Sequence, residues 1–163
     1  MGFKRILVTV DRSDRSEPVF GEALDLAKTN LAKTNGSAVK VFHCLTYRDL
    51  SEVTASLYAD VGPYPDLMAR AYQDQQARIA EQRRYVEEML ERYQALASDR
   101  GIEVETGYAI GEAGHSICHA ATEWNADLIV LGRRGRSGLT EAFLGSVSNY
   151  VLHHAHSCVL VIQ

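Results

Sequence analysis

The sequence predicts a single α/β domain built around a parallel sheet. Apolar runs of strand length alternate with segments of helical apolar spacing, giving five strands and four helices in strict alternation. A strand, a helix and a second strand in succession form a crossover unit, and crossovers make neighbouring strands parallel. The 163 residues suit one domain, residues 1–163. With 46% hydrophobic and 23% charged residues, the composition excludes disorder, collagen and a disulfide scaffold.

The chain opens with one such unit. Residues 6–10, Ile-Leu-Val-Thr-Val, are a β-branched strand pattern that ends at Asp11. Ser16 is predicted to cap the following helix, and Gly36 to end it. A second strand follows over residues 39–45.

Residues 46–66 and 68–98 are the unusual parts of the pattern. Residues 46–66 mix tyrosine, proline and short apolar patches, as in an irregular connection that serves as a lid or a binding surface. Residues 68–98 predict a helix about 45 Å long. A compact chain of this length has a radius of gyration of about 15 Å. The helix would therefore overhang the domain, so we expect a kink or a partner.

The second half of the chain repeats the alternation. The spacing predicts a strand with one solvent-exposed face over residues 102–106 and a helix over 111–124. The most apolar strand follows at 127–131, then a helix at 145–155 and a closing strand at 158–162.

A glycine-rich segment between the last two strands indicates phosphate binding. Residues 131–146 follow a buried strand and lead into a helix. Glycines let backbone amides approach an anion, and a helix N-terminus favours negative charge. Asp11 ends the first strand at the same edge of the sheet, where ligands bind in α/β folds. Three arginines add positive charge: Arg133, Arg134 and Arg136.

Familiar nucleotide motifs are missing from this segment. The sequence has no GxxxxGK[ST] loop, and no lysine follows Lys40. A GxGxxG after the first strand is missing as well. These facts exclude a P-loop and a dinucleotide fingerprint.

The spacing of Gly132, Gly135 and the pair Gly145-Ser146 resembles the G-2x-G-9x-G-[S/T] signature of the universal stress protein family, in its nucleotide-binding branch. The opening strand with Asp11, the strand at 127–131 and the closing strand resemble the family too. The resemblance covers the whole chain.

The resemblance implies a Rossmann-like fold of the adenine nucleotide alpha hydrolase type. Its five strands would lie in the order 3-2-1-4-5, with helices on both faces. It also implies ATP or another adenine nucleotide, often with Mg²⁺ or Mn²⁺, and a dimer. Asp11 would meet the ribose or the metal. The cofactor-binding residues carried over by position are Thr9, Asp11, Cys44, Gly132, Arg133, Arg134, Gly135, Gly145, Ser146, Val147 and Ser148.

Three functions compete on this basis. The leading one is a nucleotide-binding stress or regulatory protein whose output is a change in conformation or partner binding. The second is a slow ATPase, although no catalytic motif is evident. The third is a dimeric scaffold that has lost its nucleotide, which the intact glycines and Ser146 disfavour.

Other sequence features bear on location and partners. A net charge of −4 argues against nucleic-acid binding, and no apolar run reaches 18 residues. Without a signal peptide, we expect a cytoplasmic protein whose cysteines are free thiols, with Cys44 and Cys158 on buried strands.

His115 and His119, four residues apart, favour an exposed helical face over a metal site. The apolar edge strand 158–162 predicts a homodimer, with a further protein partner left unidentified.

Overall fold

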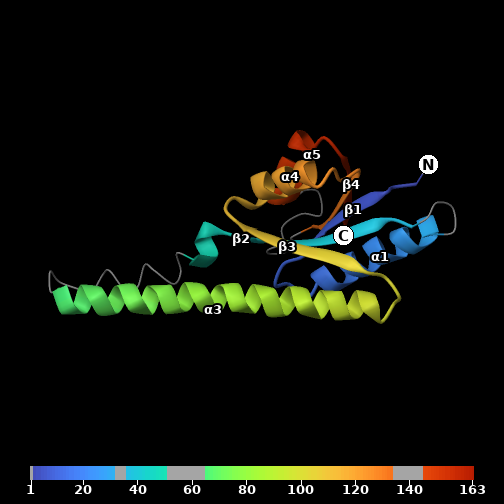
Figure 1. Cartoon of the computed structure of the whole chain (residues 1–163). Coiled ribbons are helices and arrows are strands. Elements are labelled where there is room, and N and C mark those ends of the chain that lie inside the picture. The colour runs from blue at the N-terminus through green and yellow to red at the C-terminus, as the bar shows by residue number, and fades with distance from the viewer. Residues whose placement is uncertain (1, 32–35, 51–64, 134–144) are drawn as a thin grey trace.

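The computed structural model describes residues 2–31, 36–50, 65–133 and 145–163. Five parallel strands form one sheet: β1 (Arg5–Thr9), β2 (Ala38–Leu45), β3 (Val104–Ile110), β4 (Leu128–Gly132) and β5 (Cys158–Ile162). Their order is β3-β2-β1-β4-β5, which confirms the predicted topology (Figure 1).

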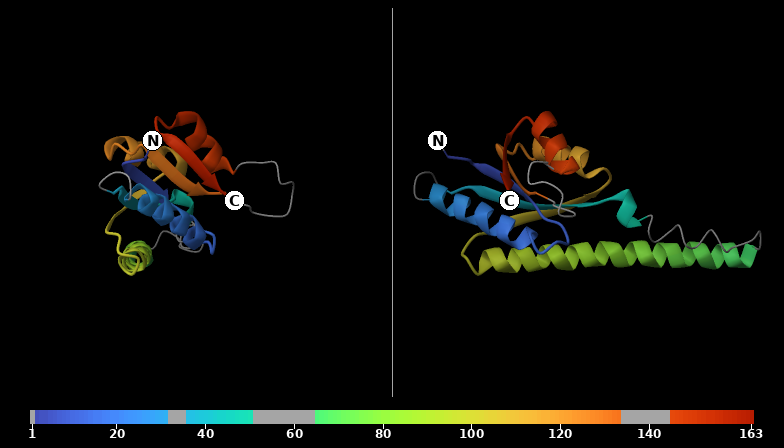
Figure 2. Two further views of the ribbon diagram at one scale, coloured as in Figure 1. Left: turned by 90° about the vertical axis from the view of Figure 1, so that its right-hand side faces the viewer. Right: turned by 180° about the vertical axis from the view of Figure 1, so that it is seen from behind.

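Helices cover both faces of the sheet (Figure 2). The four predicted helices are α1 (Ser16–Leu31), α3 (Pro65–Ser98), α4 (Ala113–Glu123) and α5 (Ser146–His154). The segment 46–66 was predicted to be irregular, but residues 47–50 form a short helical turn, and its role as a lid or binding surface falls on residues 51–64, which lie outside the described part of the chain. Ile6 and Val8 pack with residues of α1 and α3, whereas Leu7 between them packs with residues of α4 and α5. Because strand side chains alternate between faces, β1 has a separate apolar core on each side.

Most predicted boundaries lie within three residues of the observed ones, but the third strand was placed too early. The prediction was 102–106, whereas β3 begins at Val104 and runs to Ile110. Gly101 has a φ of +73°, and the Ile102 amide donates to the Ala97 carbonyl at 3.0 Å. Ile102 therefore closes the end of α3 and does not belong to the strand.

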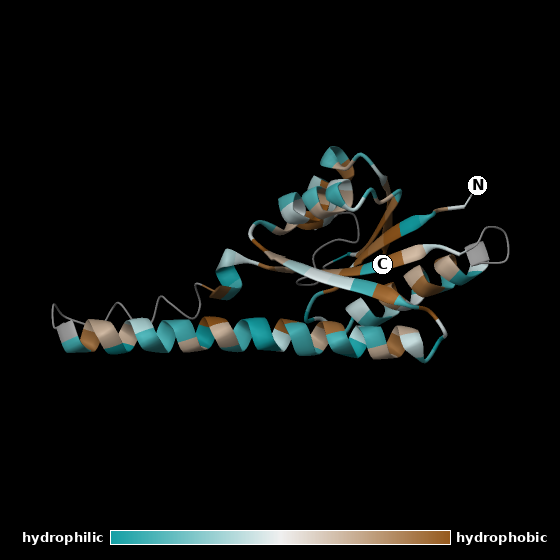
Figure 3. Cartoon of the chain, in the orientation of Figure 1, coloured by the Kyte–Doolittle hydropathy of each residue, from teal (hydrophilic) through white to brown (hydrophobic). Residues whose placement is uncertain are grey.

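Helix α3 overhangs the domain, as its length predicted. Its 34 residues make a rod of about 51 Å, and its N-terminal part projects beyond the sheet (Figures 1 and 2). The helix is straight (Figure 1), so of the two expected alternatives, a kink or a partner, the partner stays a prediction. Val86, Leu90, Tyr93 and Ala97 are buried against the domain, and Ile79 is half-buried. Much of the remaining surface of α3 is hydrophilic (Figure 3).

The cysteines depart in part from expectation. All three thiols are free, and Cys44 and Cys118 are half-buried. Cys158, however, is exposed, so its predicted burial was wrong. It is the first residue of an edge strand, where one neighbouring strand is missing. None of the helices that the structure describes is both long and apolar enough to cross a membrane.

Candidate functional site

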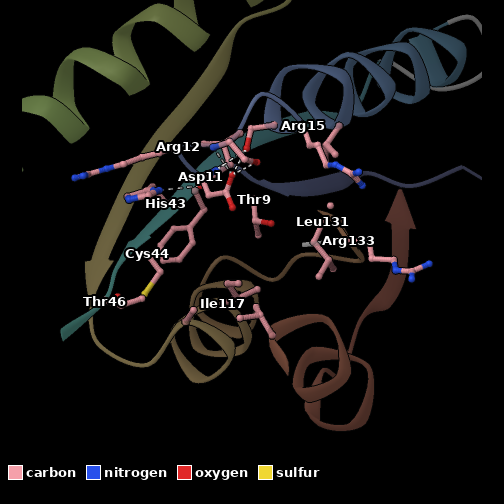
Figure 4. Close-up of a pocket in the computed structure, with 18 of the residues that line it drawn as sticks. Thr9, Asp11, Arg12, Arg15, His43, Cys44, Thr46, Ile117, Leu131 and Arg133 are labelled. Carbon is pink, nitrogen blue, oxygen red and sulfur yellow. Dashed lines mark hydrogen bonds between the residues drawn. The ribbon is translucent and has the colours of Figure 1, made fainter. Parts of the chain in front are cut away.

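A cleft lies where the carboxyl ends of β1, β2 and β4 meet. The chain moves from β1 outward to β2 and β3, then crosses back to place β4 on the other side of β1. Connections therefore leave β1 and β4 in opposite directions, which opens a crevice between them. Figure 4 shows the side chains that line it. The described lining consists of Thr9, Val10, Asp11, Arg12, Ser13, Arg15, Ser16, Val19, Phe42, His43, Cys44, Thr46, Asp49, Ala113, Ile117, Leu131, Gly132, Arg133 and Val147.

Asp11 is held at the cleft by the turn into α1. Its Oδ1 accepts hydrogen bonds from the Ser13 amide, at 2.8 Å, and from the hydroxyls of Ser13 and Ser16. The Asp11 amide in turn donates to the Ser16 hydroxyl at 2.7 Å. Ser16 was predicted to cap α1, but in these two hydrogen bonds its hydroxyl binds Asp11. Asp11 thus both shapes the start of α1 and lines the cleft.

His43 is a buried histidine whose hydrogen bond fixes its tautomer. Its Nδ1 lies 2.8 Å from the Val10 carbonyl, and because a carbonyl only accepts, Nδ1 carries the proton. Its Nε2 is buried and has no hydrogen-bond partner among the described residues. Burial lowers the pKa of His43, and the bond to Val10 opposes this only in part. The residue is therefore neutral at physiological pH.

Cys44 and the turn after β2 form the next wall. The Cys44 thiol contacts the Gly111 carbonyl at 3.4 Å, and burial raises the pKa of this thiol. The amide and hydroxyl of Thr46 donate to the Asp49 carboxylate at 2.8 and 2.6 Å. Partial burial works against ionisation of Asp49, but the bonds from Thr46 together with the positive charge of Arg12 lower its pKa overall. Asp49 is therefore a fixed anion at the rim.

Arg12 connects the cleft to α3. Its guanidinium donates to the Gln82 side chain and lies 4.5 Å from the centre of the Tyr85 ring. Figure 4 shows its side chain directed away from the centre of the cleft. The loop that carries Asp11 is therefore tied directly to the long helix.

The opposite wall consists of the end of β4 and the start of α5. A Cβ on Gly132 would lie 3.1 Å from a methyl group of Val19, so any other residue here would require Val19 to shift by a few tenths of an ångström. The Arg133 amide donates to the Ile162 carbonyl at 2.8 Å. Gly145 is the N-cap of α5 with φ −61° and ψ 158°, and as a glycine it offers no side chain to cap the helix.

Six of the eleven predicted cofactor-binding residues line the cleft: Thr9, Asp11, Cys44, Gly132, Arg133 and Val147. Gly145, Ser146 and Ser148 belong to the start of α5 but are not among the lining residues. Ser146 is exposed, and the buried Ser148 hydroxyl donates to the Gly145 carbonyl at 2.9 Å. Arg134 and Gly135, like Arg136, lie outside the described residues.

Several lining residues were not predicted. The Thr46-x-x-Asp49 spacing is a capping pattern that a search for helix starts would have found. Phe42 and Ile117 look like ordinary core residues in sequence, and nothing local shows that they reach the cleft. His43 likewise requires the packing of β1 against β2 to be known.

The two histidines on α4 lie on an exposed face, as predicted. Their rings stack at 6.3 Å, and His119 pairs with Glu123 at 3.3 Å. Among the described residues, no group of three His, Cys, Asp or Glu side chains could hold a metal ion.

We expect His43 to make stability pH-dependent just below neutrality. Its pKa is lowered from 6.5 in the folded chain, so the unfolded chain binds the proton more readily. The stability from neutral His43 is complete above that value and is lost as the pH falls toward the folded pKa. Urea midpoints at about pH 7.5 and 5.5 should therefore differ more in the wild type than in His43→Asn, which keeps a donor but does not titrate. Equal pH dependence in the two proteins would contradict this role.

The topology and cleft define an open, doubly wound α/β protein with a ligand crevice at its switch point. Comparisons with known proteins identify the family to which the chain belongs. The model of the universal stress protein family matches residues 2–163, so the chain belongs to that family. It is 35% identical to universal stress protein Sll1388 of Synechocystis, over 100% of this chain and 99% of the relative. Its identity to YxiE of Bacillus subtilis is 34%, over 99% of both chains.

Solved structures share the fold. The structure of hypothetical protein MJ0577 superposes with a TM-score of 0.73 at 20% identity, covering 99% of this chain and 96% of that one. A universal stress protein in complex with cAMP gives 0.56 at 18% identity, covering 100% and 98%. An Arabidopsis thaliana family member with AMP bound gives 0.57 at 17% identity, covering 98% and 90%.

Proposed function

We propose that this chain is an adenine-nucleotide-binding universal stress protein that acts in the cytoplasm as a regulatory binding protein. The observation that carries the proposal is the cleft itself: a carboxylate, a glycine and a helix start converge at the switch point of the sheet. The AMP- and cAMP-bound structural neighbours support the choice of an adenine nucleotide. Free thiols suit a reducing compartment.

The cleft offers a distinct environment for each part of a nucleotide. Thr9, Phe42 and Cys44 form a wall that suits the flat base, and Asp11 can accept from ribose hydroxyls. Gly132 and the start of α5 suit the phosphates. The described residues enclose about 130 Å³, less than the roughly 300 Å³ of a typical ligand pocket. The phosphates would therefore extend along the sheet edge, beyond the described cleft.

A divalent metal fits this site only together with the nucleotide. Asp11 is the carboxylate nearest the proposed ribose and phosphate positions, and Mg²⁺ is commonly held by one or two carboxylates plus phosphate oxygens. Asp11 would hold such an ion from one side, and the ion would neutralise phosphate charge.

Calorimetric titration with ATP, ADP, AMP and GTP tests the proposal. We expect saturable binding of one adenine nucleotide per chain and much weaker binding of GTP. Mass spectrometry of material released from the denatured, purified protein would identify the physiological nucleotide. Absence of saturable heat with all adenine nucleotides at millimolar concentration would refute the proposal.

If binding is the function, ATP turnover should be very slow. The described cleft has no lysine and no paired carboxylates, so it offers little beyond binding to accelerate phosphoryl transfer. A phosphate-release assay should give a rate far below the enzyme median of roughly 10 s⁻¹. A rate near that median, abolished by Asp11→Ala, would favour the ATPase alternative.

We further propose a homodimer through β5. This strand is apolar throughout and lies at the edge of the sheet, an arrangement that invites pairing with a second copy about a two-fold axis. Light scattering at micromolar concentration should give twice the 18.1 kDa chain mass. Val159→Lys combined with Val161→Pro should reduce it to the monomer. A monomeric wild type, or a dimer that survives both changes, would contradict this interface.

A further inference from the structure

Arg15 lines the cleft but takes part in none of the contacts that hold it together. It lies in the turn that leads into α1, and its side chain is exposed. Among the described residues, none forms a hydrogen bond or an ion pair with its guanidinium. A guanidinium carries five N–H donors, and here they are free to bind a ligand.

Arg12, three residues earlier in the same loop, is placed differently. Its guanidinium donates to Gln82 and lies against the Tyr85 ring. In Figure 4 the two arginine side chains extend in opposite directions, and Arg15 lies on the side of the cleft that carries Leu131. The loop after β1 therefore offers Arg15, and not Arg12, to a ligand on the β4 side.

The start of α1 places Arg15 beside the end of β4. The Val19 amide donates to the Arg15 carbonyl at 3.3 Å, so the two residues lie one helical turn apart on the same face. A methyl group of Val19 lies 3.1 Å from the Cβ position of Gly132, the last residue of β4. Since α1 runs back from the carboxyl edge of the sheet, Arg15 lies one turn, about 5.4 Å, further toward that edge than Val19.

The cleft runs from β2 to β4, and this direction decides which part of a nucleotide meets Arg15. The proposed wall for the base contains Phe42 and Cys44 of β2, and Asp11 follows β1. Gly132, where the phosphates would pass, ends β4 on the far side. A nucleotide laid along this path reaches Arg15 last, with its outer phosphates.

The guanidinium matches a phosphate chain in both charge and shape. It presents two parallel N–H donors to phosphate oxygens and stays ionised throughout the physiological pH range. A nucleoside monophosphate ends at its α-phosphate, so it has no group at the position that the outer phosphates of ADP and ATP would occupy. A contact with Arg15 would therefore distinguish nucleotides by the number of their phosphates.

From this placement we propose that Arg15 binds the β- and γ-phosphates of the nucleotide and makes the site selective for di- and triphosphates over monophosphates. The inference rests on the proposed nucleotide site and specifies which nucleotides that site takes. Arg15 is a binding and specificity residue, and no chemical step is assigned to it.

Calorimetric titration with adenosine, AMP, ADP and ATP tests the assignment, in EDTA so that no metal ion masks the phosphate charge. The wild type should bind ADP and ATP more tightly than AMP. Arg15→Gln should bind ADP and ATP about tenfold more weakly, which is the effect of losing one charged hydrogen-bonding group. Its affinity for adenosine and AMP should stay at the wild-type value, which also shows that the variant is folded.

Arg100→Gln is the matched control. It removes the same charge from an exposed arginine that precedes β3, at the opposite edge of the sheet, where Arg100 pairs with Asp25 at 3.8 Å. Its ATP affinity should equal that of the wild type, which separates a local contact from the loss of net charge. Raising the salt from about 0.05 to 0.5 M should weaken ATP binding more in the wild type than in Arg15→Gln.

The ³¹P NMR spectrum of bound ATP reports which phosphates Arg15 contacts. The resonances of the β- and γ-phosphorus should differ between the wild type and Arg15→Gln. The α-phosphorus resonance should be the same in both proteins.

Four results would overturn the inference while leaving the nucleotide site in place. These are an unchanged ATP affinity in Arg15→Gln, equal losses for AMP and ATP in that variant, equal ATP losses in Arg15→Gln and Arg100→Gln, or a resonance change confined to the α-phosphorus. If the wild type bound no adenine nucleotide at all, the proposed function itself would be refuted, and the role of Arg15 with it.

Discussion

Gly145→Asp is expected to weaken adenine-nucleotide binding about a hundredfold without destabilising the fold. Gly145 caps α5 in an extended conformation with negative φ, which aspartate adopts readily. Aspartate is a better N-cap than glycine and favours the positive end of the helix, so stability should hold or rise slightly. The same carboxylate would repel phosphates at the helix start, by up to about 4 kcal/mol at 4 Å near a protein surface.

Gly145→Asn is the matched control, because asparagine caps a helix equally well but carries no charge. Calorimetric titration with ATP and urea unfolding should be run on both variants. Binding should be weak only in Gly145→Asp, while both variants stay folded. Wild-type affinity in Gly145→Asp would show that phosphates do not meet this helix end.

Gly114→Ala is expected to destabilise the protein by about 2 kcal/mol, although alanine normally favours a helix over glycine. A Cβ at this position would lie 2.7, 2.8 and 2.9 Å from Cδ1, Cγ and Cβ of Tyr150. Tyr150 cannot retreat easily, because its ring stacks on His154 at 4.0 Å between centroids. The added methyl group would therefore force α4 and α5 apart.

The free energy of unfolding in urea measures this effect, and a double-mutant cycle assigns it. Tyr150→Ala removes the contacts to Cδ1 and Cγ and leaves only the 2.9 Å contact to Cβ, so Gly114→Ala should cost clearly less in that background than in the wild type. An equal loss of unfolding free energy in both backgrounds would mean that Tyr150 is not the cause. A higher unfolding free energy for Gly114→Ala in the wild-type background would show that α4 and α5 can accommodate the added methyl group.

The strands and helices were predictable because their apolar spacing is strong. Residues 158–162 form an uninterrupted apolar run, and the predicted strand matches β5 at both ends. The beginning of β3 was not predictable, because Ile102 is apolar like a strand residue but is drawn into the end of α3 by its bond to Ala97. The local apolar pattern cannot show whether Ile102 begins a strand or closes a helix.

The candidate site was predictable where it rests on backbone geometry. Asp11, just after β1, and Gly132, the last residue of β4, both line the cleft as their positions at strand ends implied. Residues that act through long-range packing were missed. The bond of His43 to Val10, the reach of Arg12 to Gln82 and the approach of Val19 to Gly132 each join elements far apart in sequence. Only the folded sheet brings these groups together.

An NMR titration of the ¹⁵N-labelled chain with ATP tests the central claim most directly, because it reports binding and location together. We predict saturable shift changes in the amides around Asp11, Cys44 and Gly132 and in the first turn of α5, with the β3 edge unchanged. Absence of shift changes at millimolar ATP, or changes confined to residues away from the cleft, would contradict the assignment of a nucleotide site.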